Sequence, residues 1–118
     1  MTQIAVAVMP IADVGAWRDF LDEISTGDRS EAHRAFLRRG GVARETAFRQ
    51  ETPMGDLMVL VWDGVDPEQM AAHFGSMLQH PTTDHEQYLA DYVIPKVHGI
   101  DTSQPPPPPA QRVTEITV

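Results

Sequence analysis

The chain contains no cysteine, which excludes disulfide bonds, zinc sites built from thiolates and a cysteine nucleophile. Basic residues are few: nine lysines and arginines stand against seventeen acids, and the net charge of the 118 residues is −8. This charge makes a DNA or RNA backbone a poor partner, so no nucleic acid is expected. The first apolar run is too short for a signal peptide or a membrane span, because Pro10 and Asp13 interrupt it. A cytoplasmic protein without membrane association is therefore the expectation.

The composition indicates one globular domain followed by a tail. With 42% hydrophobic and 22% charged residues the chain can bury a core, and residues 1–103 suit a single domain of about 100 residues. Residues 104–110 contain five consecutive prolines, which favour an extended spacer of roughly 15 Å. Residues 111–118 are rich in β-branched side chains. They are predicted either to fray as a terminus or to add as a strand to the sheet edge of a neighbouring chain.

Hydrophobic spacing predicts the elements of the first part of the chain. Residues 3–9 alternate larger aliphatic side chains with alanine, which is typical of a strand. Apolar residues from 14 to 24 then fall at helical spacing, with Asp13 as the N-cap. A second helix is predicted over residues 28–39, because Asp28 is followed three residues later by an acid in a capping-box pattern.

The sequence VARETAFRQETPMGDLMVLVWDG, residues 42–64, predicts a β-hairpin. Pro53 suits the second position of a type I turn, and Gly55 suits the left-handed position after it. The second arm, residues 57–62, is apolar at every position, which indicates a strand buried on both faces. The first arm alternates and carries polar residues, among them Arg44, Glu45, Arg49 and Gln50.

Two helices and a short strand are predicted after the hairpin. An Asp-Pro pair starts a helix that runs from residue 67 to about residue 79. Thr83 opens a capping box for the next helix, and Pro95 is predicted to stop that helix. Residues 97–100 are predicted as a short last strand.

This order of elements predicts a ferredoxin-like α+β sandwich, a mainly antiparallel sheet with helices on one face. Helices on one side leave the second sheet face open, whereas residues 57–62 require burial on both faces. In so short a chain the simplest cover is the sheet of a second copy. A homodimer is therefore expected, with two sheets packed face to face as a dimeric barrel.

The segments QIAVAVM, GGVARETAFRQETPMGDLMVLVWDG and VHGID resemble the dimeric α+β barrel superfamily. That superfamily includes the antibiotic-biosynthesis-type monooxygenases, muconolactone-isomerase-like proteins and many uncharacterised bacterial proteins. The resemblance covers about residues 3–101. It implies the ferredoxin-like fold, a dimer and a cleft between helices and sheet, but no catalytic residue, because no signature of a named enzyme branch is present.

The stretch HPTTDHEQYLADYVIPKVHG, residues 80–99, holds three of the five histidines. A metal site is not expected there, because a helix cap and a proline separate the candidate ligands. His73 and His80 share a helix side but lie seven residues apart, roughly 10 Å, which is too far to chelate one ion. Glycine-rich phosphate loops and a nucleophile elbow are also absent from the sequence, so no cofactor is expected.

Six of the nine basic residues lie between residues 28 and 51, which places a net positive patch in an acidic chain. One interpretation is a solvated helix face paired with nearby acids. The other is an anion site, since arginine can bind a carboxylate or phosphate through two parallel hydrogen bonds.

Three hypotheses of function follow from these features. The first is a small dimeric protein that binds an apolar or aromatic small anion, without established catalysis, in a cleft lined by Arg44, Arg49, Trp62 and His73. The second is a cofactor-independent monooxygenase or isomerase in which His73 or His98 removes a proton from an acidic carbon and Arg44 stabilises the enolate. The third is a structural or interaction protein that acts through its C-terminal tail.

Overall fold

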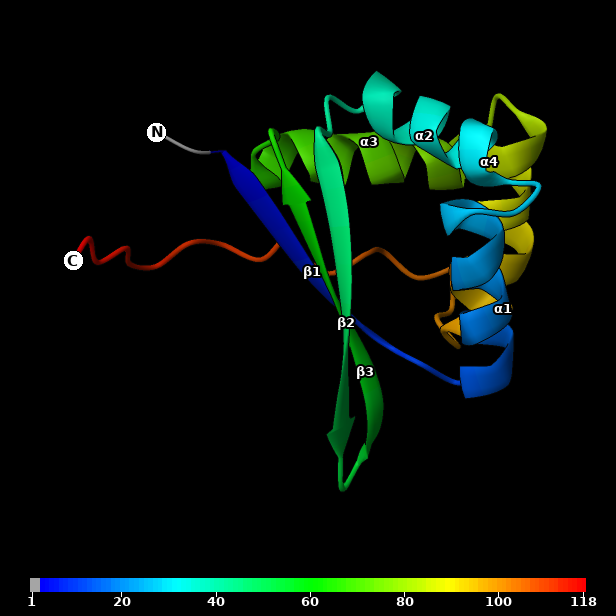
Figure 1. Cartoon of the computed structure of the whole chain (residues 1–118), viewed down its shortest axis with the longest axis horizontal. Helices are drawn as coiled ribbons and strands as arrows, with labels where there is room; N and C mark the ends of the chain where they lie inside the picture. The colour runs from blue at the N-terminus through cyan, green and yellow to red at the C-terminus, as the bar shows by residue number, and fades with distance from the viewer. Residues whose placement is uncertain (1–2) are drawn as a thin grey trace.

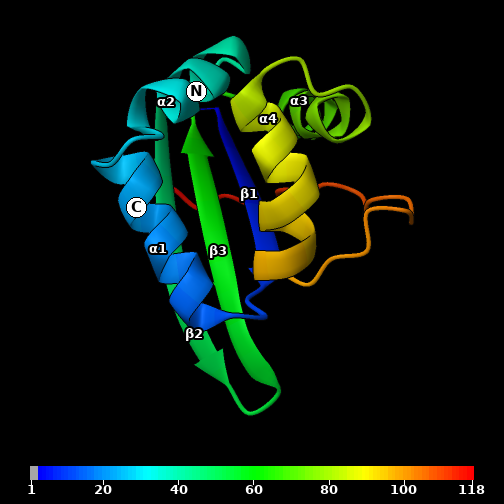
Figure 2. The same cartoon turned by 90° about the vertical axis from the view of Figure 1, so that its right-hand side faces the viewer.

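The computed structural model describes residues 3–118 and has an α+β architecture. Its elements follow in the order β1 (Ile4–Pro10), α1 (Val14–Ser25), α2 (Ser30–Arg39), β2 (Arg44–Thr52), β3 (Gly55–Asp63), α3 (Pro67–Gln79), α4 (Asp84–Tyr88) and the π-helix η1 (Leu89–Val97). Helices α1 and α2, with α4 and η1, lie on one side of the sheet (Figure 1), and Figure 2 looks onto that side. None of the helices in residues 3–118 is long and apolar enough to cross a membrane.

The sheet has three strands in the order β1-β3-β2, and both outer strands run antiparallel to β3. The predicted hairpin is confirmed: β2 and β3 pair from Arg44 with Asp63 to Thr52 with Gly55. The two-residue loop between them is closed by Thr52, whose hydroxyl donates to the Gly55 carbonyl at 2.6 Å. Gly55 has a φ of +120°, a conformation that side chains with a Cβ rarely adopt.

The two faces of the sheet differ in their cover. On β3, Met58, Leu60 and Trp62 point toward the helices and are buried in the core. The residues that alternate with them point to the opposite face and are only half-buried. Beside them, Val8 on β1 is 57% exposed and Phe48 on β2 is 55% exposed. Within one chain, therefore, β3 is buried on one face, and the second face is apolar and open.

Local capping signals predicted three helix starts correctly. Asp13 accepts from the Ala16 amide at the start of α1, and Thr83 accepts from the Glu86 amide at the start of α4. Asp66 forms a reciprocal capping box with Gln69 before the proline that opens α3. The core between these helices and the sheet includes the least exposed large side chains, Phe36, Met77, Val65, Val93 and Val97.

The predicted start of the second helix is wrong. Helix α2 begins at Ser30, its N-cap is Arg29, and no side chain caps it. The backbone before Ser30 still forms the hydrogen bonds that end α1. The Arg29 amide donates to the Glu23 carbonyl at 3.1 Å, and the Gly27 amide donates to the Asp22 carbonyl at 3.0 Å. Asp28 therefore lies in a turn between two helices rather than at a helix start.

Two predictions near the end of the domain are also wrong. Pro95 does not stop its helix but lies inside η1. In an α-helix a proline ring collides with the carbonyl four residues earlier, and the wider π turn relieves this contact. Residues 97–100 form no strand, because the Val97 carbonyl accepts from the Ala12 amide at 2.8 Å and ties this segment to the connection after β1.

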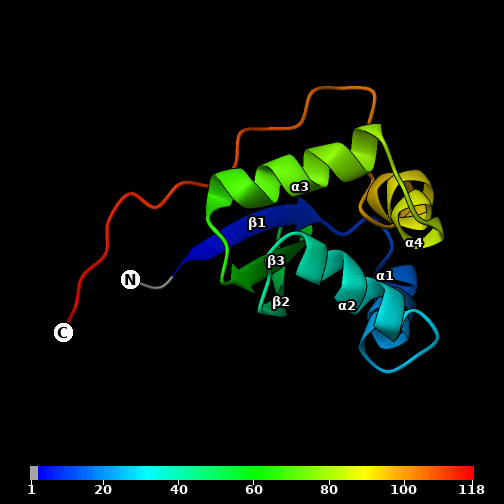
Figure 3. The same ribbon diagram turned by 90° about the horizontal axis from the view of Figure 1, so that it is seen from above.

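The tail has no regular secondary structure. Residues 104–118 form an extended, mostly exposed chain that passes beside α3 (Figure 3). They end on the side of the sheet opposite α1 and η1 (Figure 3). The apolar side chains of the last residues are free of packing, with Val113 92% and Ile116 81% exposed.

Candidate functional site

A groove of about 540 Å³ lies between the α1–α2 corner and the edge strand β2. Its floor is apolar and is formed by Leu21, Ile24, Leu37, Val42, Ala43 and Ala47. A smaller cavity of about 40 Å³ lies deeper, between the helices and the sheet, and shares Leu21, Ile24, His33 and Glu45 with the groove. The groove has the size of a small-molecule site, whereas the cavity holds no more than a few waters.

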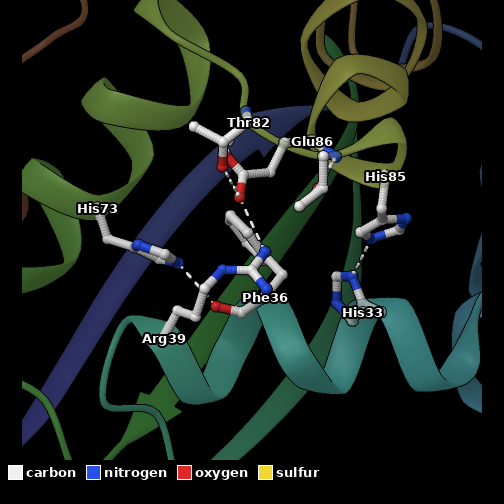
Figure 4. A network of polar contacts seen from close by, with 8 residues as sticks. His33, Phe36, Arg39, His73, Thr82, His85 and Glu86 are labelled. Carbon is white, nitrogen blue, oxygen red and sulfur yellow. Dashed lines mark hydrogen bonds and ion pairs between the residues drawn. The ribbon is translucent and has the colours of Figure 1, made fainter.

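Four polar side chains form a hydrogen-bonded chain at the wall shared by the groove and the cavity. His85 Nε2 lies 2.9 Å from His33 Nδ1, and His33 Nε2 lies 2.9 Å from Glu45 Oε1. Trp62 Nε1 donates to the second carboxylate oxygen of Glu45 at 2.7 Å. Figure 4 shows the inner end of this chain, where His33 on α2 and His85 on α4 point toward each other.

The elements around the groove explain why these residues meet. Side chains alternate along a strand, so Glu45 points toward the helices while its neighbour Arg44 points to the open face. The hairpin register places Glu45 directly opposite Trp62. His33 occupies the buried side of α2 next to Phe36, and the Thr83 cap fixes the first turn of α4, which carries His85.

The proton positions in this chain follow from the acceptor at its end. Because a carboxylate only accepts, His33 Nε2 donates to Glu45, and a neutral His33 then accepts at Nδ1 from His85 Nε2–H. The pKa of His85 is lowered from 6.5 to about 4, first by burial and then by His33, Arg29 and Arg39, against an opposing effect of Glu86. His85 is therefore neutral near pH 7, and its Nδ1 is buried without a hydrogen-bond partner among residues 3–118.

A second set of polar contacts holds the helices around this chain in place. The Arg39 guanidinium donates to the buried Glu86 carboxylate at 2.8 Å, which joins α2 to α4. The Thr82 hydroxyl also bonds Glu86, at 3.3 Å (Figure 4). On the other side, the Arg29 guanidinium lies 3.4 Å above the Tyr88 ring. These contacts fix the positions of α2 and α4, from which His33 and His85 extend.

Three arginines line the outer part of the groove. Arg34 and Arg38 stand one helical turn apart on α2, and Arg44 begins β2. Arg34 donates to the Ser25 carbonyl at 3.2 Å, and Arg44 pairs with Asp63 at 2.9 Å on the opposite side of the sheet. The guanidinium of Arg38 forms no ion pair within the described part of the chain. The groove thus combines an apolar floor, a cationic rim and one carboxylate at its inner wall.

The five residues named from the sequence do not form one site. Trp62 is 2% exposed and meets the groove through its hydrogen bond to Glu45. Arg44 borders the groove, but its guanidinium is bound to Asp63. Arg49 lies nearer the hairpin loop, where it pairs with Asp56 at 3.1 Å and Glu51 at 3.4 Å.

Both histidines named from the sequence are bound to backbone carbonyls. His73 Nε2 donates to the Phe36 carbonyl at 2.8 Å, and its ring stacks on the Phe36 ring (Figure 4). His98 lines the small cavity, and its Nδ1 donates to the Pro10 carbonyl at 2.8 Å. Burial lowers the pKa of His98, against an opposing effect of that hydrogen bond. The groove instead presents His33 and Glu45, which the sequence hypotheses did not include.

Neither a metal site nor a similar protein indicates the function of this groove. Among residues 3–118 no three histidine, aspartate or glutamate side chains are arranged to hold a metal ion. No protein-family model, curated protein or solved structure compared with the chain matches it. The groove itself is therefore the basis for a function.

Proposed function

We propose that this protein binds a small apolar or aromatic anion in the groove between α1, α2 and β2. The observation that carries the proposal is the cationic rim over an apolar floor: three arginines and one carboxylate line a groove of about 540 Å³ in a chain of net charge −8. An apolar ring would cover the floor residues, and its anionic group would meet the arginines.

Arg38 is the arginine best suited to hold the anion. Arg34 and Arg44 already have acceptors in Ser25 and Asp63, whereas the Arg38 guanidinium is exposed and has no ion-pair partner among residues 3–118. A carboxylate bound there gains a charge-assisted hydrogen bond without breaking an existing one. The exposure of Arg38 keeps the gain moderate, because water screens the pair.

The test is a titration with 2-naphthoate that is measured by isothermal calorimetry. The wild-type protein is expected to bind it more tightly than neutral 2-naphthalenemethanol. Arg38→Gln should weaken naphthoate binding by about three- to fivefold while leaving the neutral probe unaffected. Arg18→Gln is the matched control, since Arg18 is an exposed arginine on α1 that does not line the groove. Equal affinity for both probes, or equal losses in the two variants, would contradict the proposal.

We further propose a ferredoxin-like homodimer in which the open sheet faces of two copies pack together. The register of the sheet aligns Val8, Val59 and Phe48 in one row across the strands, and Val6, Val61 and Thr46 in the next. The outer residues of the first row are more than half exposed in the single chain. Water contact of so apolar a face is costly, and a copy of the same face provides matching apolar rows.

Sedimentation velocity tests the dimer. Wild-type protein is expected to sediment as a dimer at micromolar concentration, and Val59→Asp is expected to sediment as a monomer, because the carboxylate would be buried at the centre of the interface. Met54→Asp is the control, since Met54 is 97% exposed in the hairpin loop. A monomeric wild-type protein, or a dimeric Val59→Asp variant, would rule out this interface.

The His33–Glu45 pair supports a second candidate function, a cofactor-independent enzyme of the isomerase or monooxygenase type. Glu45 lines the groove, so its carboxylate is placed to take a proton from a bound carbon acid. His73 and His98, by contrast, do not line the groove, although donation through His73 Nε2 and His98 Nδ1 leaves the other nitrogen of each ring as an acceptor. Deuterium exchange at the benzylic carbon of phenylpyruvate in heavy water, compared between wild type and Glu45→Gln, separates catalysis from binding alone.

A further inference from the structure

The carboxylate of Glu45 is unusual for the place it occupies. Among the aspartates and glutamates of residues 3–118, Glu45 alone lines the apolar groove and the apolar cavity. Its side chain is 16% exposed. Its histidine partner is His33, which is hydrogen-bonded to it at 2.9 Å, and no lysine or arginine pairs with it within that part of the chain. A largely buried carboxylate without a permanent cation destabilises a fold unless its oxygens are well supplied with hydrogen-bond donors.

Only half of the hydrogen-bond acceptor positions of the Glu45 carboxylate are occupied by donors. An ionised carboxylate offers about four acceptor positions on two oxygens. Trp62 Nε1–H occupies one position on one oxygen at 2.7 Å, and His33 Nε2–H occupies one on the other at 2.9 Å. The remaining positions are open to solvent where Glu45 lines the groove, and a ligand bound there would displace water from them.

The ligand's chemistry decides whether this displacement is favourable. A ligand that presents only carbon to Glu45 leaves a charged acceptor desolvated and short of donors. A ligand that presents a hydroxyl at the same place replaces the water with a charge-assisted hydrogen bond. The carboxylate therefore selects for a donor at the end of the ligand that lies away from the arginine rim.

We infer that the groove takes hydroxylated aromatic acids, with the ligand carboxylate at Arg38, the ring on the apolar floor and a phenolic hydroxyl donated to Glu45. His33 and Trp62 act as positioning residues, since their two N–H groups hold the carboxylate at the wall of the groove. This inference rests on the proposed function, because it uses the same groove and the same anion contact.

The experiment compares the affinities of four probes of similar shape: phenylacetate, 4-methylphenylacetate, 4-hydroxyphenylacetate and 3-hydroxyphenylacetate, the last two of which place the hydroxyl at different positions. The methyl group matches the hydroxyl in size but donates no hydrogen bond. In the wild-type protein at least one hydroxylated probe should bind about tenfold more tightly than the methyl probe. In Glu45→Gln, whose amide has lost the charge, that preference should fall below about threefold.

Controls separate the hydroxyl contact from the anion contact. Glu31→Gln removes an exposed acid from the first turn of α2 and should leave the hydroxyl preference unchanged. Arg38→Gln should weaken the acid probes while keeping the ratio of hydroxyl to methyl affinity. Trp62→Phe removes a donor that positions Glu45, so the hydroxyl preference should fall while the affinity for phenylacetate stays similar.

The outcomes distinguish the two proposals. If the acids bind in an Arg38-dependent way but the methyl probe equals both hydroxyl probes, the hydroxyl contact is wrong and the anion groove stands. If none of the acids binds, the proposed function is wrong and the inference falls with it. If Glu45→Gln proves unstable, the ratio of hydroxyl to methyl affinity in the wild-type protein still decides, because it requires no variant.

Discussion

Replacing His85 should change how the stability of the protein depends on pH. In the folded chain the His85 imidazole is 4% exposed and donates through Nε2 to His33, while its Nδ1 is buried without a partner. Burial is the largest cause that lowers its pKa from 6.5 to about 4, followed by the charges of His33, Arg29 and Arg39. Between these two pH values the unfolded chain binds a proton that the folded chain does not bind. Acid therefore favours unfolding in this range, and the stability is fully present above about pH 6.5.

The size of the effect follows from the two pKa values. A fall from 6.5 to about 4 corresponds to about 3 kcal/mol of unfolding free energy, lost progressively as the pH falls through that interval. Lowering the pH from about 7.5 to about 5.5 should remove about 1.3 kcal/mol through this residue. This narrower range stays above the sequence isoelectric point near 4.9, where a chain without net charge tends to precipitate. His98, whose pKa burial also lowers, contributes with the same sign in every variant.

The assay is urea unfolding at the two pH values, at one fixed protein concentration, followed by the fluorescence of the core tryptophans Trp17 and Trp62. His85→Gln keeps a donor for His33 but does not titrate, so its loss of stability on acidification should be smaller than the wild-type loss by about 1.3 kcal/mol. His80→Gln is the control, because His80 is exposed at the end of α3. Equal pH dependence in wild type and His85→Gln would refute the reasoning.

Two further predictions concern a helix cap and the tail. Asp66→Ala removes the capping box of α3 and should lower the free energy of unfolding by about 1 kcal/mol in the same urea assay. Asp66→Asn should retain most of this stability. Deleting residues 105–118 should leave the far-ultraviolet circular dichroism of the domain unchanged, because these residues are mostly exposed, and should weaken the dimer if the tail contacts a second copy. An unchanged dimer dissociation constant would exclude the tail from the interface.

The elements that the sequence predicts correctly are those set by local chemistry. The strand at residues 4–10, the hairpin and the helix after Asp66 each have a periodic apolar pattern and a start or turn signal within a few residues. The error at residues 97–100 occurs where a distant backbone group competes. Residues 97–100 look like a strand, yet Val97 bonds to Ala12, and that contact is not visible in the local pattern.

The candidate site was missed for a similar reason. His33 and Glu45 are 12 positions apart, and His33 and His85 are 52 positions apart, so neither pair forms a sequence motif. One signal was available: the Trp62 indole needs an acceptor, and a two-residue hairpin loop places residue 45 opposite residue 62. That register identifies Glu45 as the acceptor, but the position of His33 depends on how α2 packs over the sheet.

Adjacent residues on β2 connect the two proposed surfaces. Arg44 points to the open face and pairs with Asp63, while Glu45 points to the groove and accepts from Trp62, and each pair joins β2 to β3 at neighbouring register positions. Replacing Arg44 would therefore disturb the edge of the proposed dimer interface and the end of the groove together. Arg38 lies on α2, on the helix side of the sheet, so a loss of ligand affinity in Arg38→Gln with an unchanged sedimentation coefficient can be assigned to the groove alone.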